Sequence, residues 1–402
     1  MENRRVVVTG IGILADNGRT LKEYRDNCYQ LVSGLKKCTV FDASMLQTDI
    51  VGQIDMELPY ENQSPMEKSR TESIVEYCLE NMLRDGDMTK EYISSLNERA
   101  ALSFGTSLQN AEKVMSYVKR KNQGCKDSAW ITNIANLQAD IKNYLGIMGE
   151  CYTTTTACAA STTACGIGFD LIKANVADLV IVGGVDPLNE YSLYGFNTLK
   201  ALSKSQCKPF DVNRDGINIG EGGAFLILET LEKAKERNAK IYAEICGYGI
   251  NNDAYHITSP DPNGKGAVLS MRMAIDSSNI TVEDIDYINA HGTGTTLNDS
   301  MEVKAINELF DSTNKKVLVS ATKACIGHCL AAAGILELVI TIMMLKDNKV
   351  MGNASLTEPM DCGESMELIR EIKEVDLTYA LSNSFAFAGN TASILIKKYQ
   401  DE

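Results

Sequence analysis

A cysteine introduces a run of small residues near the middle of the chain. Cys158 follows four threonines and one alanine, and it precedes a helix-like stretch from Ala160 to Ala174. Unpaired backbone N–H groups and the positive end of a helix dipole favour a thiolate over a thiol at such a position. We therefore interpret Cys158 as a nucleophile, and its neighbours Cys151 and Cys165 as packing residues.

Two of the chain's three histidines follow strand-like runs. His291 comes directly after the apolar run that ends at Asn289, and it enters a loop of glycine and threonine. His328 follows a second run, which ends at Ser320 and is followed by Lys323. Loops at strand ends are where α/β proteins place reactive groups, so both histidines are functional candidates.

Other interpretations of these loops have weaker support. The glycines after His291 form neither Gly-Lys-Ser/Thr nor Gly-x-Gly-x-x-Gly, which argues against a phosphate cradle. Cys325, His328 and Cys329 have a helical metal-site spacing but no fourth ligand nearby, so we expect no metal. A last polar loop, residues 383–390, has small residues that would let backbone N–H groups approach a ligand.

The composition bounds the class of protein. The chain has 402 residues, of which 44% are hydrophobic and 23% charged, which excludes a disordered chain. Its net charge of −14 opposes nucleic acid and anionic membranes, and we expect neither as a partner. The longest apolar run, residues 334–345, is interrupted by Glu337 and is too short to span a bilayer. We expect a cytoplasmic protein with reduced thiols.

Strand-like and helix-like stretches alternate along the whole chain. We expect strands at 6–9, 101–104, 179–182, 224–228, 241–245, 285–289, 317–320 and 392–396, and helices at 67–83, 160–174, 264–276, 300–310 and 330–345. This alternation favours a layered α/β architecture. The two halves meet near residues 230–240, and the pattern alone leaves open whether they are duplicates.

Taken in order, these motifs resemble the β-ketoacyl-acyl-carrier-protein synthases, the condensing enzymes of fatty-acid and polyketide synthesis, and their elongating branch in particular. The resemblance spans nearly the whole chain, through residues 4–10, 156–158 and 253–258 and the segments around His291, Lys323 and His328. It implies an α/β thiolase-like fold of two pseudo-duplicated halves in α-β-α-β-α layers. Residues 1–235 would carry the cysteine, and residues 236–402 the histidines and the lysine.

The resemblance also implies the chemistry. Cys158 would take an acyl chain from acyl carrier protein as a thioester. His291 and His328 would face the malonyl thioester oxygen while malonyl-carrier protein loses carbon dioxide and attacks, which gives a 3-oxoacyl product two carbons longer. The backbone N–H groups of Cys158 and Phe387 would form a second oxyanion hole. No cofactor is implied.

Supporting roles follow from the same resemblance. Lys323 would orient the histidines electrostatically, and Glu302 would be the acidic partner of that lysine. His256 would be structural or gating. Where the family usually has Gly-Phe-Gly-Gly-Thr-Asn, this chain has alanine at 386 and 388. Alanine resists positive φ, so we expect a stiffer or differently posed loop and a specialised substrate range.

The implied partner, acyl carrier protein, is acidic and needs a basic patch on an acidic body. Candidates for this patch are Lys68 and Arg70 at the head of a helix, Lys119, Arg120 and Lys121 in a loop-like run, and Lys204. We expect a homodimer, or a heterodimer with a chain-length-factor-like subunit.

Four alternative functions use the same fold. A thiolase needs a second cysteine near the C-terminal loop, where this chain has Ser382, Asn383 and Ser384. A non-catalytic chain-length factor typically lacks the nucleophile that is present here. A coenzyme A-dependent condensing enzyme, and an active synthase that needs a chain-length-factor partner, stay open.

Overall fold

The computed structural model describes residues 4–58, 68–124 and 137–400. Its main feature is an eleven-stranded sheet in the order β12-β10-β9-β14-β15-β8-β1-β7-β6-β4-β5. In that order the strands are Met366–Leu368, Val317–Ser320, Ile285–Asn289, Tyr379–Phe385, Asn390–Lys398, Ala243–Asn252, Val6–Ala15, Gly222–Thr230, Leu179–Asp186, Ala100–Gly105 and Cys151–Thr154. Two small sheets pair β2 (Leu35–Lys37) with β3 (Ile50–Gly52), and β11 (Lys349–Val350) with β13 (Lys373–Glu374).

The strand pairing repeats itself in the two halves of the chain. In the first half β1 pairs antiparallel with β7, β7 antiparallel with β6, and β6 and β5 both parallel with β4. In the second half β8, β15, β14, β9 and β10 repeat that pattern. The halves join where β1 pairs with β8. A pseudo-duplicated α/β fold, which the sequence pattern had left open, is therefore confirmed.

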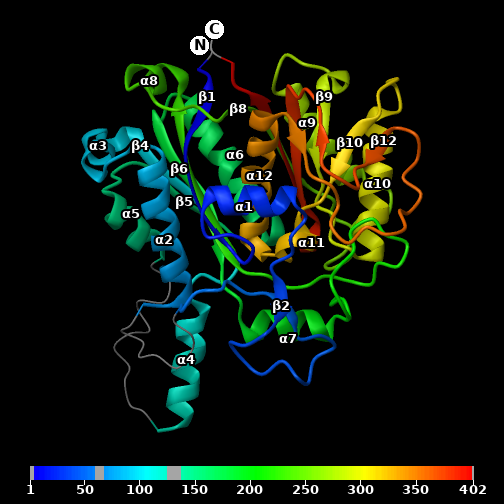
Figure 1. The fold of residues 1–402 in the computed structure, drawn as a ribbon. Coiled ribbons are helices and arrows are strands. Elements are labelled where there is room, and N and C mark those ends of the chain that lie inside the picture. The colour runs from blue at the N-terminus through cyan, green and yellow to red at the C-terminus, as the bar shows by residue number, and fades with distance from the viewer. Residues whose placement is uncertain (1–3, 59–67, 125–136, 401–402) are drawn as a thin grey trace.

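Helices form layers between and outside the two halves of the sheet (Figure 1). In the centre lie α6 (Ala160–Lys173) and α12 (Ala333–Asp347), which contact each other and strands of both halves. Outside the first half lie α2 (Arg70–Asp85), α3 (Lys90–Ser95) and α5 (Leu137–Leu145), and outside the second half lie α9 (Lys265–Asp276) and α10 (Thr296–Phe310). The remaining helices are α1 (Leu21–Tyr29), α4 (Ala111–Asn122), α7 (Glu190–Thr198), α8 (Leu231–Glu236) and α11 (Lys323–Ile326).

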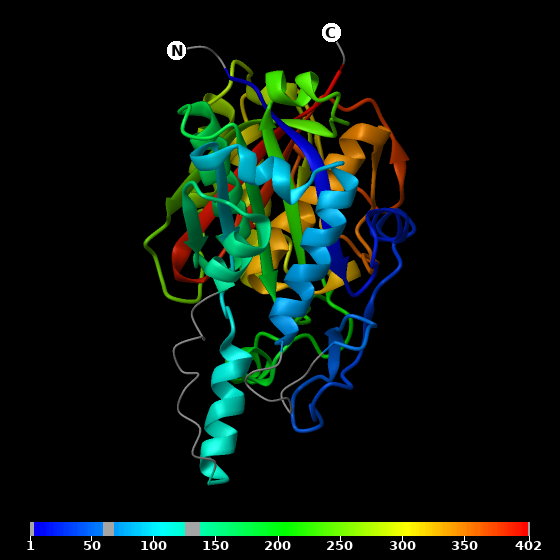
Figure 2. The same ribbon diagram turned by 90° about the vertical axis from the view of Figure 1, so that its left-hand side faces the viewer.

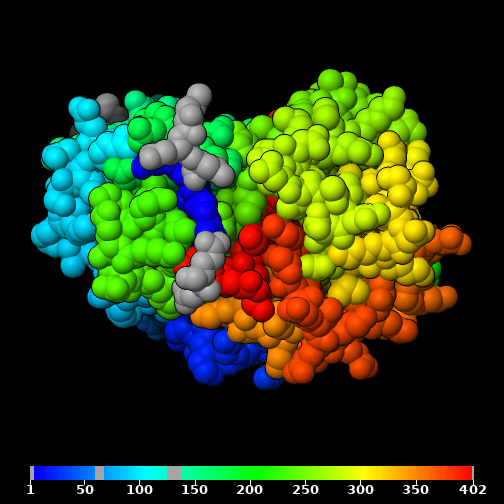
Figure 3. Space-filling view, turned by 90° about the horizontal axis from the view of Figure 1, so that it is seen from above, coloured from blue at the N-terminus to red at the C-terminus, as the bar shows by residue number. Residues whose placement is uncertain are grey.

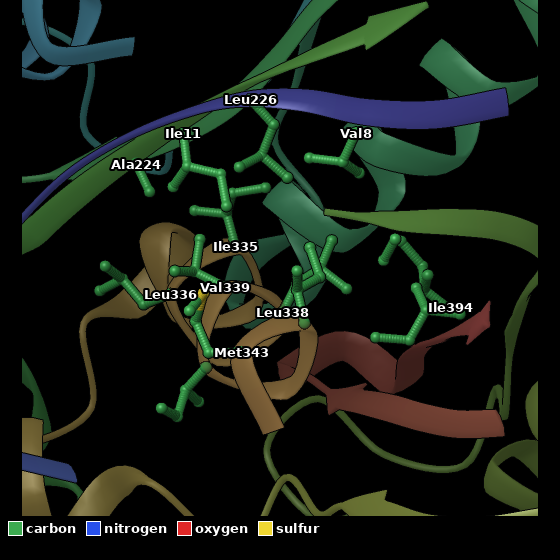
Figure 4. Packing of buried hydrophobic residues seen from close by; sticks show 14 of the residues in the cluster. Val8, Ile11, Ala224, Leu226, Ile335, Leu336, Leu338, Val339, Met343 and Ile394 are labelled. Carbon is green, nitrogen blue, oxygen red and sulfur yellow. The ribbon is translucent and has the colours of Figure 1, made fainter. Parts of the chain in front are cut away.

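Helix α12 is buried because it is apolar on almost all sides, whereas α6 is rich in small residues that let it lie close to the strands. Figure 4 shows Ile335 and Val339 of α12 packing beneath Ile11 of β1 and Leu226 of β7. All four side chains are at most 2% exposed. This packing fixes the loops at both ends of α12 relative to the sheet.

The outline of the molecule has two distinct ends. Helix α4 projects from one end, and α8 lies at the other (Figures 1 and 2). Seen from the α8 end, the two halves lie side by side with the C-terminal strand between them (Figure 3). Among the described residues, no helix is long and apolar enough to cross a membrane.

Candidate active site

The C-terminal ends of parallel strands converge on one site from both halves. Strands β4, β5 and β6 end side by side in the first half, as do β9, β10 and β14 in the second. Cys158 lies just beyond β5, and His291 just beyond β9. The segment that holds Lys323 and His328 follows β10. The expected strand-end positions thus bring the three reactive side chains together.

Cys158 occupies a short 3₁₀ turn, Ala157–Ala159, that leads directly into α6. Ala157 has a φ of +50°, so the chain turns sharply before the nucleophile. Helix α6 begins tight against β4, because a Cβ on Gly105 would lie 2.4 Å from the backbone nitrogen of Ser161. Glycine is required at position 105 for this close approach.

The Cys158 thiol faces a cavity of about 330 Å³ that His291, His328 and Phe387 also line. The cysteine is only 7% exposed, and burial raises the pKa of its thiol to about 11. The positive charge of Lys323 and the backbone N–H groups of Phe387 and Cys158 oppose that shift. The prediction of a thiolate is therefore wrong for the site without substrate. Burial raises the pKa of the thiol more than the start of the helix lowers it.

The two histidines lie edge to face, with ring centroids 5.5 Å apart. His291 Nδ1 lies 3.2 Å from Lys323 Nζ, and His328 Nδ1 accepts a hydrogen bond of 3.1 Å from the backbone N–H of Leu330. Burial and the charge of Lys323 hold the pKa of both imidazoles well below the usual value. Both rings are therefore neutral, and both carry their proton on Nε2, as a pair of hydrogen-bond donors.

Lys323 is fully buried and pairs with Glu337 of α12 at 2.5 Å. It also donates to the backbone carbonyl of His291. The prediction that Glu302 pairs with Lys323 is wrong. The Glu302 carboxylate instead accepts hydrogen bonds from the backbone N–H groups of His291 and Gly292, each at 2.8 Å. Burial raises the pKa of Glu302 to about 7. The sequence did carry a signal for Glu337, as the one charged residue inside an otherwise apolar run.

The loop after β14 presents Phe387 to the site. The Phe387 ring stacks on Phe196 of α7, with centroids 5.5 Å apart. Ala386 is extended at φ −121°, whereas Ala388 adopts φ +60°. The expected conflict between alanine and positive φ therefore falls on Ala388 alone.

A second loop is tied to this one. The backbone N–H of Ala388 donates to the carbonyl of Ile257 at 2.7 Å. Nearby His256 is exposed, and its Nδ1 accepts from the backbone N–H groups of Thr258 and Ser259. His256 thus supports a turn and does not reach the other two histidines.

Two expectations for the basic patch are wrong. Arg70 is only 2% exposed and pairs with the buried Glu221, so it offers no docking charge. The run from Lys119 to Lys121 is the last turn of α4 and not a loop. Lys119 lies 3.3 Å from Glu190, while Lys68, which pairs with Glu76, and Lys204 are exposed.

Comparisons with known proteins cover the whole chain. Residues 3–234 match the family model "Beta-ketoacyl synthase, N-terminal domain", and residues 242–357 match "Beta-ketoacyl synthase, C-terminal domain". The chain is 32% identical to 3-oxoacyl-[acyl-carrier-protein] synthase 2 of Staphylococcus aureus (strain COL), over 99% of both chains.

Two solved structures are similar over 99% of this chain and 100% of theirs. One is a type II polyketide ketosynthase in complex with its acyl-carrier protein, with a TM-score of 0.89 and 26% identity. The other is the ishigamide ketosynthase/chain length factor, with a TM-score of 0.89 and 28% identity.

Proposed function

Because the chain belongs to the β-ketoacyl synthase family, we propose that it is an active 3-oxoacyl-[acyl-carrier-protein] synthase. It is an acyltransferase that condenses an acyl chain with the malonyl group of malonyl-acyl carrier protein by decarboxylation. The observation that carries this proposal is the shared cavity, where the Cys158 thiol and two neutral Nε2–H donors meet.

The first half-reaction is acyl transfer. Cys158 Sγ attacks the thioester carbonyl of the acyl-carrier protein, and a C–S bond forms as the carrier's C–S bond breaks. The proton of the Cys158 thiol leaves with the carrier thiol. The backbone N–H groups of Cys158 and Phe387, which face the thiol, would bind the oxyanion of the tetrahedral intermediate.

The second half-reaction joins the two carbon units. The malonyl carboxylate leaves as carbon dioxide, and the electron pair passes to the thioester enolate. The Nε2–H groups of His291 and His328 would stabilise the enolate oxygen, where negative charge develops. The enolate carbon then attacks the acyl-Cys158 carbonyl, and the cysteine leaves as a thiolate that takes a proton from water. The product is a 3-oxoacyl-carrier protein two carbons longer.

Acyl carrier protein is the partner in both half-reactions, as the similar polyketide ketosynthase complex supports. A homodimer and a heterodimer with a chain-length-factor-like subunit are both proposed, the second because of the similarity to the ishigamide ketosynthase/chain length factor. Purification of this chain alone, followed by sizing and a condensation assay, decides between them. The comparisons do not favour a coenzyme A-dependent enzyme, and the cytoplasmic location stays a prediction.

The division into an N-terminal half, 1–235, and a C-terminal half, 236–402, is also a proposal. It is supported by the end of α8 at Glu236 and the start of β8 at Ala243.

Intact mass spectrometry after incubation with an acyl-carrier protein tests the function. We expect one acyl mass on the wild type and none on Cys158→Ala. Cys165→Ala is the matched control. Cys165 is a fully buried thiol further along, within α6, so this substitution should not alter acylation. An acyl mass that persists in Cys158→Ala would refute the assignment.

A further inference from the structure

A buried carboxylate at the end of β6 lies between the loop that follows β4 and the segment that follows His328, and it has no part in the steps above. Asp186 is fully buried and is the last residue of its strand. Its carboxylate accepts hydrogen bonds from Thr106 Oγ1 at 2.9 Å and from the backbone N–H groups of Ser107 and Leu108 at 3.0 and 3.1 Å. It therefore fixes the loop that follows β4.

The other carboxylate oxygen of Asp186 binds the segment that follows His328. It accepts from the backbone N–H of Ala331 at 2.9 Å. Ala331 follows Leu330, which has a φ of +51°, a conformation that a leucine adopts only when its surroundings hold it there. Leu330 in turn supplies the backbone N–H that His328 Nδ1 accepts.

The geometry points to Asp186 as a positioning residue: by holding Ala331, it keeps Leu330 in the conformation that fixes the Nε2–H tautomer of His328. This inference rests on the proposed function, because its effect falls on the enolate donor of the second half-reaction. The same carboxylate joins the segment that carries that donor to the loop after β4, so one residue holds two neighbouring segments together.

The charge of Asp186 also bears on the nucleophile. Burial raises the pKa of Asp186 to about 6, against the lowering effect of its hydrogen bonds, so the group is ionised at pH 7.5. Its negative charge is one of the causes that raise the pKa of the Cys158 thiol. Removing the charge should therefore make the thiol more reactive while it weakens the histidine donor. Replacing a residue with only a structural role would not increase the reactivity of the thiol and weaken the histidine donor at the same time.

The test is Asp186→Asn, which keeps the shape but places an amide N–H₂ against backbone N–H donors. We expect Cys158 to be acylated at least as fast as in the wild type, and decarboxylation of malonyl-carrier protein to be slowed about tenfold or more. Iodoacetamide should alkylate Cys158 faster at pH 8 than in the wild type. With three histidines in the chain, ¹⁵N-imidazole spectra resolve the His328 tautomer, and its Nε2–H signature should be lost or mixed.

Asp211→Asn is the matched control, because Asp211 is a fully buried carboxylate that accepts several backbone N–H bonds from residues 213 and 357–358. It should lower the melting temperature and leave the ratio of the two half-reactions unchanged. Asp186→Glu keeps the charge but shifts the acceptor, so it should keep the wild-type alkylation rate and give an intermediate ratio. If Asp186→Asn does not fold, Asp186→Glu still tests the positioning role.

The outcomes separate the two proposals. A wild type that performs neither half-reaction overturns the proposed function. A wild type that performs both, with the same ratio and the same His328 tautomer in the Asp186 variants, overturns only the positioning role.

Discussion

Lys323 adds to the effect of burial on the protonation of both histidines without lining the cavity. Its ammonium group contacts His291 Nδ1 and the carboxylate of Glu337, and its charge lowers the pKa of both His291 and His328. Neutral imidazoles present Nε2–H donors without carrying a charge that would bind the malonyl carboxylate and resist its loss. Burial, together with a buried cation, therefore keeps the two histidines in the neutral form.

Alanine substitution of each histidine separates the two half-reactions. We expect His291→Ala and His328→Ala to retain acylation of Cys158 and to lose condensation by about 100-fold or more, because each removes one enolate donor. Mass spectrometry measures acylation, and carbon dioxide release measures decarboxylation. His256→Ala is the control, since His256 is exposed. A variant that still condenses at the wild-type rate removes that histidine from the mechanism.

The Cys158 thiol should show a steep pH dependence in the free enzyme. Its pKa is raised to about 11, so the reactive thiolate is a small fraction at neutral pH and grows about tenfold for each pH unit up to pH 10. Alkylation by iodoacetamide, followed by mass spectrometry of the Cys158 peptide, checks this. A rate that levels off below pH 8 would show that the thiol is instead activated.

The sequence predicted which side chains the structure brings together in the cavity, but not the partners of these side chains. Cys158, His291 and His328 each follow a recognisable local pattern, a strand end or a helix start, that can be read from a few adjacent residues. Which carboxylate meets Lys323 depends on how α12 packs against the sheet, and no spacing along the chain encodes that. Arg70 was misjudged for the same reason, because its partner Glu221 is distant in sequence.

At the scale of elements, the loop after β14 combines a residue that lines the cavity, Phe387, with a strained one, Ala388. Ala388 holds φ +60°, which costs an alanine on the order of 1 kcal/mol relative to glycine. Its backbone N–H is bound to Ile257 of the neighbouring loop, so the two loops hold each other in place. This restraint supports the prediction of a specialised acyl range, which acyl-carrier proteins of graded length and unsaturation test. Activity with a broad range of saturated acyl chains would contradict the prediction of a specialised range.

Two glycine substitutions in this loop should have opposite effects. We expect Ala388→Gly to raise the free energy of unfolding by about 0.5–1 kcal/mol, because glycine adopts positive φ without strain. Ala386→Gly should lower it by a similar amount, because Ala386 is extended and gains only unfolded-state freedom. Denaturant titration of both variants measures this, and a shift of the same sign in both would contradict the argument.

Each strand predicted from the sequence overlaps a strand of the sheet, but the sequence pattern does not predict β5 or β14. Strand β5 has only four residues, two of them threonines, and β14 carries the polar stretch Ser382 to Ser384 just before its last residue, Phe385. Such strands lack the apolar alternation that marks a half-buried strand, and the residues at their ends serve the site instead of the core. These two strands end beside the site, next to Cys158 and Phe387.

At the scale of the whole molecule, the acidic body presents a basic helix end. The net charge is −14, and helix α4, which carries Lys119 to Lys121 in its last turn, projects from the end opposite α8 (Figure 1). A projecting positive end on a negative body orients an acidic partner during its approach.

Charge reversal of Lys119, Arg120 and Lys121 to glutamate tests this helix end. We expect the KM for acyl-carrier protein to rise about fivefold to tenfold, with little change for a small thioester analogue that needs no protein docking. Lys233→Glu with Lys235→Glu in α8 is the control at the far end of the molecule. Equal effects on both substrates would remove α4 from the docking surface.

The pairing of β1 with both β7 and β8 has a consequence for synthesis of the protein. Val6 pairs with Thr230 and Ile245, so the first strand made is completed only when more than half the chain exists. At ribosomal speeds it waits about 10–45 s for β7. Throughout that time β1 is an unpaired apolar edge, open to mispairing with other nascent chains. The strand that unites the two halves of the finished enzyme is thus the one most in need of a chaperone while it is being made.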